Sequence, residues 1–93
     1  MLGGHAFPTI VFTSEFLESL ATNRFSSAER RRIFHALELL DTNERHPSLR
    51  IHQLRGHLAG QWSASASDEL RITFIRLDGG RKRLLSCSRH HAR

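Results

Sequence analysis

The sequence lacks the features that mark several large classes of protein. Cys87 is the only cysteine, so no disulfide can form within the chain, and a reducing compartment is expected. No apolar run approaches the roughly 20 residues needed to cross a bilayer. The first residues show no basic stretch followed by a long apolar one, as a signal peptide would. We therefore expect a cytoplasmic protein without a membrane span.

Motifs that bind nucleotides or zinc are also absent. The chain has no P-loop, no GxGxxG, no HExxH and no CxxC. His52, His90 and His91 could supply metal ligands, but no carboxylate or cysteine has the spacing that would complete a site. We expect neither a metal nor a small-molecule cofactor.

Positive charge is concentrated in the second part of the chain. Residues 1–45 hold five arginines against six acids, whereas residues 46–93 hold nine Arg or Lys against three acids. Five of the seven histidines also lie there: His46, His52, His57, His90 and His91. Such a basic face suits a polyanion such as nucleic acid, or an acidic protein partner. A solvated basic surface explains the same charges, so charge alone leaves these alternatives open.

The first half of the chain predicts one strand and two helices within a single domain over residues 1–93. A β-branched apolar run predicts a strand over 9–12. Thr13 as an N-cap, followed by apolar residues at helical spacing, predicts a helix over 14–22. Ser26 and Glu29 have the spacing of a capping box, which begins a second helix.

From residue 49 onward, helical periodicity gives way to alternation. It predicts strands over 49–54, 61–67, 70–77 and 83–88, joined by short turns. The order is therefore β-α-α-β-β-β-β. We expect an α+β fold, with the two N-terminal helices packed on one face of a mostly antiparallel four- to five-stranded sheet.

The predicted strand 61–67 separates a core face from a polar face. Trp62 alternates with Ser63, and the pattern continues to residue 67, so every second side chain is a serine. Trp62 should be buried under the helices. We expect Ser63 and Ser65 to form the floor of an open face that also carries Arg71.

Arginines and histidines are predicted to converge on this open face and on the C-terminal segment. The set comprises His52, Arg55, Arg71, Arg89, His90 and His91. Arginine can bind a phosphate and stabilise the extra charge of its transition state, and histidine can transfer protons near neutral pH. Together they could cleave RNA without a metal, by attack of the 2′-OH on the neighbouring phosphate. The alternatives are that Arg71 is a structural salt-bridge partner and that the terminal histidines are a solvated tail.

The sequence resembles the RelE/ParE superfamily of bacterial toxins. The resemblance covers nearly the whole chain, through IVFTSEF, LRIHQLRGHLAGQWSASASDELRITF and LLSCSRHH, and is strongest to YoeB-type mRNA interferases. It implies a small α+β toxin that cleaves mRNA in the ribosomal A site, and an antitoxin that wraps and blocks it. A ParE-like inhibitor of DNA gyrase, or a decayed toxin that only binds its antitoxin or RNA, remains an alternative.

The resemblance also suggests roles for individual residues. Arg71 matches the phosphate-stabilising arginine, and His90 the C-terminal general acid. Arg55 matches a basic residue that contacts the RNA backbone, and Arg50 and Arg89 are further expected phosphate contacts. The sequence departs from the family pattern at three kinds of position. His52 replaces a glutamate base, His91 replaces an aromatic residue, and serines replace the lysines of the RelE branch at positions 63 and 65.

Overall fold

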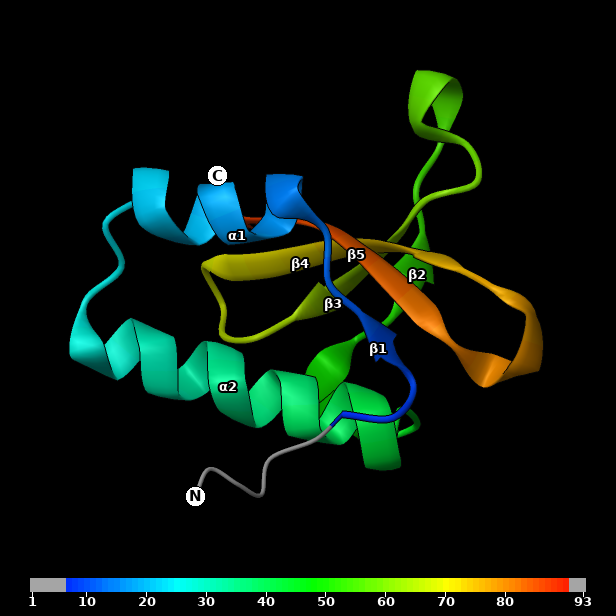
Figure 1. Cartoon of the computed structure of the whole chain (residues 1–93), viewed down its shortest axis with the longest axis horizontal. Helices are drawn as coiled ribbons and strands as arrows, with labels where there is room; N and C mark the ends of the chain where they lie inside the picture. Colours follow the sequence, from blue (N-terminus) through cyan, green and yellow to red (C-terminus); the bar gives the residue numbers. More distant parts are fainter. Residues whose placement is uncertain (1–6, 91–93) are drawn as a thin grey trace.

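The computed structural model describes residues 7–90 as two helices packed against a five-stranded mixed sheet (Figure 1). The elements are β1 (Ile10–Val11), α1 (Ser14–Thr22), α2 (Ser27–Thr42), β2 (His52–Gln53), β3 (Trp62–Ser65), β4 (Leu70–Arg76) and β5 (Lys82–Arg89). This confirms the predicted α+β class and the order β-α-α-β-β-β-β. Within residues 7–90, no helix is long and apolar enough to span a membrane.

The helix starts follow from the caps that the sequence predicts. Thr13 caps α1, because its hydroxyl accepts a hydrogen bond from the backbone N–H of Phe16. Ser26 and Glu29 form the predicted capping box of α2, with each side chain bound to the other residue's backbone N–H. These local bonds satisfy N–H groups that have no partner inside the helix.

The strands follow the order β1-β5-β4-β3-β2, with β1 parallel to β5 and the other neighbours antiparallel. The predicted strand over 49–54 is wrong in length, because only His52 and Gln53 pair as a strand. Residues Pro47–Leu49 form a 3₁₀ turn instead, and Arg50 follows with a φ of 45° in the left-handed region. β2 is therefore a short edge strand.

A β-bulge in β5 determines which of its side chains reach each face of the sheet. Phe74 pairs with Leu84, but Thr73 pairs with Ser86, so Leu85 is an extra residue between them. Because of this insertion, Leu84 and Cys87 both point to the core although their spacing breaks strict alternation.

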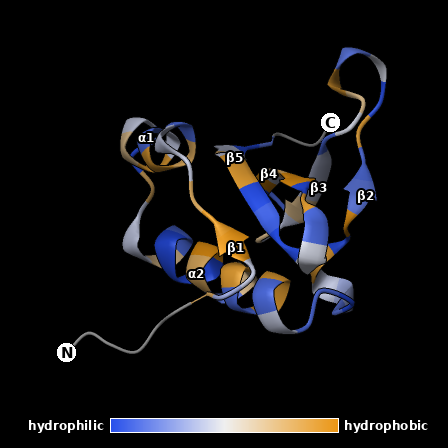
Figure 2. Cartoon of the chain, turned by 45° about the vertical axis from the view of Figure 1, so that its right-hand side comes forward, coloured by the Kyte–Doolittle hydropathy of each residue, from blue (hydrophilic) through white to orange (hydrophobic). Residues whose placement is uncertain are grey.

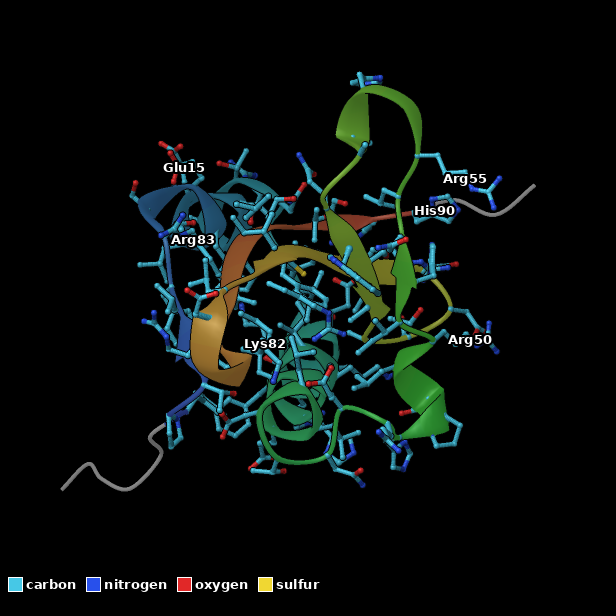
Figure 3. All side chains as sticks on the ribbon, turned by 90° about the vertical axis from the view of Figure 1, so that its right-hand side faces the viewer. Glu15, Arg50, Arg55, Lys82, Arg83 and His90 are labelled. Carbon is cyan, nitrogen blue, oxygen red and sulfur yellow. The ribbon has the colours of Figure 1, made fainter. Side chains whose placement is uncertain are left out.

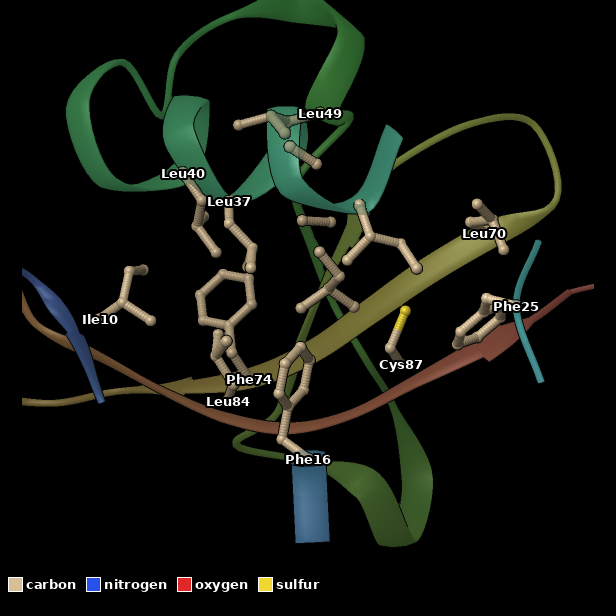
Figure 4. Close-up of a cluster of buried hydrophobic side chains, with 14 residues drawn as sticks. Ile10, Phe16, Phe25, Leu37, Leu40, Leu49, Leu70, Phe74, Leu84 and Cys87 are labelled. Carbon is tan, nitrogen blue, oxygen red and sulfur yellow. The ribbon is translucent and has the colours of Figure 1, made fainter. Parts of the chain in front are cut away.

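The core lies between the sheet and the helices, as Figure 4 shows. Figure 2 shows apolar residues of α2 and β1 facing this interior. The fully buried members of the core are Phe16, Leu40, Leu49, Leu70, Ile72, Phe74, Leu84 and Cys87.

Burial raises the pKa of the Cys87 thiol to about 12, so the thiol stays protonated and acts as a packing group, as the sequence predicts. Trp62 is only half-buried, with the Arg76 guanidinium 4.4 Å from its ring centre.

A buried lysine ties the end of α2 to the sheet. The Lys82 ammonium donates to the Leu40 carbonyl at 2.9 Å and lies 3.2 Å from a Glu44 carboxylate oxygen. The same carboxylate binds Arg76 at 2.9 Å. These contacts satisfy a charge that would otherwise be costly to bury.

Side chains of α1 take the place of a neighbouring strand along the outer edge of β5. β1 pairs only with Lys82 and Arg83, which leaves the later backbone groups of β5 without a strand partner on that side. Ser19 accepts the Cys87 N–H at 2.9 Å, and the Asn23 amide donates to the Cys87 carbonyl at 2.8 Å. The helix therefore fixes the part of β5 that leads to the C-terminal segment.

Replacing Ser19 tests this edge contact. We expect Ser19→Ala to lower the free energy of unfolding by about 1–3 kcal/mol, because the buried N–H of Cys87 loses its acceptor. Urea denaturation of the two proteins measures the difference. Ser14→Ala is the matched control, since its exposed hydroxyl contacts only Glu15 within residues 7–90. If both variants lose the same free energy of unfolding, the hydrogen bond from Cys87 to Ser19 does not stabilise the fold as expected.

Candidate functional site

The strand register places polar side chains in two rows across the face of the sheet that the helices leave open. Residues paired across antiparallel strands share a face, so each row can be read from the pairing. One row runs His52–Ser63–Thr73–Ser86, and the other runs Ser65–Arg71–Ser88. The open polar face is therefore continuous from β2 to β5.

A cavity of about 290 Å³ opens on this face. It is lined by His52, Leu54, Ser63, Arg71, Thr73, Ser88, Arg89 and His90. Four residues of the predicted site therefore meet at one cavity, although they come from β2, β4, β5 and the segment after β5. Arg50 and Arg55 do not line it, but Figure 3 shows both on the same side of the molecule as His90.

The two serines of β3 lie on the predicted face but are less accessible than expected. Ser63 is 5% exposed and Ser65 is 7% exposed. His52 and Thr73 flank Ser63 in its row, and Arg71 lies directly across from Ser65. The larger neighbours leave these short side chains at the bottom of the face. They form a floor, as predicted, and offer a substrate little surface of their own.

The guanidinium of Arg71 is held by the turn between β3 and β4. Its Nη1 donates to the carbonyls of Ser67 at 2.9 Å, Asp68 at 3.1 Å and Leu70 at 3.3 Å. Within residues 7–90, no carboxylate forms a salt bridge with Arg71. One nitrogen therefore fixes the side chain, while Nε and Nη2 keep donors in the planar arrangement that binds phosphate oxygens.

The ring of His52 has a defined tautomer when it is neutral. Its Nδ1 lies 3.0 Å from the Arg50 carbonyl oxygen. A carbonyl can only accept a hydrogen bond, so Nδ1 must carry the proton. The other nitrogen, Nε2, then has a free lone pair and can accept a proton from a substrate.

His90 follows the last residue of β5 and is exposed at the cavity. Its backbone N–H donates to the Glu69 carbonyl, which fixes the chain next to the β3–β4 turn. The turn that holds Arg71 thus also positions the backbone of His90. His91 lies outside the described residues.

Arg89 lines the cavity, but most of its donors are used elsewhere. It makes a bidentate pair with Glu29, with Nε and Nη2 at 2.9 and 2.8 Å from the carboxylate oxygens. Nη1 donates to the Asn23 carbonyl, and the guanidinium lies 4.8 Å from the Phe25 ring centre. Hydrogen bonds from Arg89, with a further one from the Ser26 N–H, lower the pKa of Glu29 to about 2. We therefore assign Arg89 to holding β5 against the start of α2.

This ion pair predicts how stability changes in acid. An unfolded glutamate binds its proton near pH 4.5, but folded Glu29 does so only near pH 2. Its contribution to stability is therefore full above pH 4.5 and is lost as the pH falls toward 2. Thermal melts across this range should show a smaller decline for Glu29→Gln than for the native chain. Glu15→Gln should keep the native decline, and identical curves for all three proteins would contradict the prediction.

Sequence reasoning missed Ser86 and Ser88, which the register places beside Thr73 and Arg71. Simple alternation from Leu84 would have put both serines on the same face as that core residue. The bulge at Leu85 moves both serines to the opposite face, and the sequence carries no local signal for the bulge.

Within residues 7–90, no three His, Cys, Asp or Glu side chains are grouped so that they could hold a metal ion.

Comparisons with known proteins find similarity at the level of structure. No family model and no curated protein sequence matches the chain. A YoeB/ParE toxin from Agrobacterium tumefaciens matches with a TM-score of 0.63 and 22% identity over 89% of this chain and 99% of its own. YoeB–YefM from Staphylococcus aureus matches with a TM-score of 0.66 and 20% identity over 88% and 95%. The E. coli DinJ–YafQ toxin–antitoxin complex matches with a TM-score of 0.67 and 18% identity over 87% and 90%.

The RelBE2 toxin–antitoxin complex from Mycobacterium tuberculosis also matches, with a TM-score of 0.60 and 22% identity over 88% of this chain and 96% of its own. Each match spans nearly the whole of both chains, so the likeness extends over the full arrangement of helices and sheet. The chain therefore has the same fold as these structures.

Proposed function

We propose that the chain is the toxin of a toxin–antitoxin system and that it cleaves mRNA on the ribosome. The observation that carries the proposal is the meeting of His52, Arg71 and His90 at one cavity on the open face. A proton acceptor, a phosphate-binding group and a proton donor are the parts that metal-independent RNA cleavage needs. The shared fold with YoeB and YafQ toxins supports the same conclusion.

Each of the three residues has one role in the proposed reaction. His52 Nε2 takes the proton of a ribose 2′-OH, and the 2′-oxygen attacks the adjacent phosphorus. The P–O5′ bond breaks as His90 donates a proton to the departing 5′-oxygen. The products are a 2′,3′-cyclic phosphate and a 5′-OH. Arg71 binds the phosphate oxygens through Nε and Nη2 and stabilises their added charge in the transition state.

The RNA chain continues on either side of the reacting phosphate, and basic groups on this side of the molecule can bind its other phosphates. Arg50 and Arg55 lie on the same side of the molecule as His90 and are proposed to contact neighbouring backbone phosphates (Figure 3). An antitoxin is the proposed protein partner, because structural neighbours were solved as YoeB–YefM and DinJ–YafQ complexes. His91, next to His90 in the sequence, is proposed to help position the substrate or relay a proton.

The proposal is tested by adding the purified chain to a translating extract and mapping the 5′ ends of a reporter mRNA. New ends that carry 5′-OH groups, and that depend on translating ribosomes, would support it. The same mRNA without ribosomes is the control. Intact mRNA together with inhibited gyrase supercoiling would reject the proposal in favour of a gyrase inhibitor. Intact mRNA with active gyrase would favour a toxin that has lost its activity.

A further inference from the structure

Arg50 combines an unusual backbone conformation with a contact to the proposed base. Its φ of 45° and ψ of 46° lie in the left-handed region, which residues other than glycine rarely occupy. Its carbonyl oxygen lies 3.0 Å from Nδ1 of His52. Residues held in this region cost free energy that the surrounding structure must offset, and they cluster at functional sites.

The residues on both sides of Arg50 hold it in this conformation. Leu49 is fully buried in the core and ends a 3₁₀ turn that begins at Pro47. The Arg50 N–H donates to the Pro47 carbonyl at 3.2 Å, which closes that turn. Ile51 packs against the core, and His52 pairs with β3. Because both ends are fixed, the backbone angles at Arg50 determine how the peptide group between Arg50 and Ile51 is oriented.

That peptide group carries the carbonyl that holds the His52 ring. A neutral imidazole can carry its proton on either nitrogen, and a hydrogen bond to one of them decides which tautomer is present. The Arg50 carbonyl keeps the proton on Nδ1 and leaves the lone pair on Nε2. Without this bond the proton can move to Nε2, and the lone pair would then be on Nδ1, which faces Arg50.

We infer that Arg50 is a positioning residue for His52 and that it acts through its backbone carbonyl. This role rests on the proposed function of His52 as the base, and it adds a requirement for the left-handed conformation at position 50. The exposed Arg50 side chain is a separate proposed contact to a phosphate. The backbone role needs no charge at position 50, but it does need a residue that tolerates a positive φ.

Two substitutions that remove the same side chain separate the backbone role from the charge. Arg50→Gly keeps the left-handed conformation at little cost, since glycine lacks the Cβ that disfavours it. Arg50→Val disfavours that conformation, because a β-branched side chain clashes with the backbone at positive φ. Both variants lose the same guanidinium, so a difference between them reports the backbone at position 50.

The tautomer of His52 is the first measurement, and it needs no RNA. In mildly alkaline solution, where imidazole is neutral, ¹⁵N NMR of the labelled full chain distinguishes a protonated ring nitrogen from an unprotonated one. The His52→Ala variant identifies the signals of this ring. The native chain and Arg50→Gly should carry the proton on Nδ1. In Arg50→Val the ratio of this tautomer to the other should fall about fivefold or more, the change that loss of one neutral hydrogen bond produces.

Arg24→Val is the matched control for backbone strain. Arg24 is also an exposed arginine in the left-handed region, with a φ of 50°, but its carbonyl accepts a hydrogen bond from Arg89 and not from His52. The control should lose stability in thermal melts as Arg50→Val does, and its His52 ring should keep the native tautomer. An equal change of tautomer in both valine variants would overturn the inference, because general loss of stability would then explain both.

The rate of cleavage is the second measurement. At saturating protein, Arg50→Val should cleave ribosome-bound mRNA about fivefold or more slowly than Arg50→Gly, in proportion to the tautomer that is lost. Equal rates in the two variants would overturn the inference, as would equal tautomers or a native ring with its proton on Nε2. A native chain that cleaves no mRNA would reject the proposed function instead, and the tautomers would still decide whether Arg50 orients the ring.

Discussion

Arg71→Ala is expected to reduce ribosome-dependent mRNA cleavage by about 10²–10³-fold, the usual cost of removing one donor that stabilises transition-state charge. Arg71 is the one arginine at the cavity that both points onto the open face and has no carboxylate partner within residues 7–90. Its Nη1 is held by three carbonyls of the β3–β4 turn, so the remaining donors are already oriented. Mapping of 5′ ends at matched protein concentrations measures the loss.

Two further variants separate charge from geometry. Arg71→Lys keeps the positive charge but loses the planar pair of donors, so it should recover only part of the activity. Arg83→Ala removes an exposed arginine on the other side of the molecule from His90 and should cleave like the native chain (Figure 3). If Arg71→Ala cleaves as well as Arg83→Ala does, the phosphate-binding role is wrong. Thermal melts of each variant exclude loss of folded protein as the cause.

The parts of the fold that the sequence predicts are those with local causes. The cap of α1 and the capping box of α2 are formed by residues three positions apart, so their spacing is visible in the chain. The strict alternation after Trp62 depends only on the period of an extended backbone, and it places Ser63 on the correct face. Burial of Cys87 within LLSC follows from the apolar residues around it.

The parts that the sequence does not predict depend on partners far along the chain. The bulge at Leu85 exists because Phe74 and Thr73 pair with Leu84 and Ser86, a register that only the folded sheet defines. The short length of β2 depends in the same way on its position at the sheet edge. Ser86 and Ser88 were missed as site residues for this reason.

Arg89 illustrates the same limit for charged residues. Its position between Ser88 and His90 suggests a phosphate contact, and nothing nearby in the sequence offers a competing anion. The anion comes instead from Glu29, 60 positions away, on the first turn of α2. An arginine in a predicted basic cluster can therefore be either a ligand for substrate or a structural partner. Only the folded chain shows that Arg89 pairs with a carboxylate whereas Arg71, within residues 7–90, does not.

His52→Ala is expected to reduce cleavage by about 10²–10⁴-fold, the range that general acid–base catalysis contributes. The bond from Nδ1 to the Arg50 carbonyl leaves Nε2 as the proton acceptor. This variant keeps Arg71 and the cavity, so it should still bind RNA and lose mainly the rate of the chemical step. Single-turnover cleavage with saturating protein measures that rate, and a loss confined to binding would contradict the assignment.

His52→Glu gives the sharper test of the same role, because it changes the base without removing it. The sequence resemblance implies a glutamate at this position in YoeB-type toxins, and a carboxylate can also accept the proton of the 2′-OH. A carboxylic acid is a stronger acid than an imidazolium ion, so a carboxylate base remains ionised in more acidic solution. We therefore expect His52→Glu to keep more activity than His52→Ala. We also expect the acidic side of its pH–rate profile to move to lower pH. A profile that matches the native one would show that His52 is not the base and would shift that role to another group at the cavity.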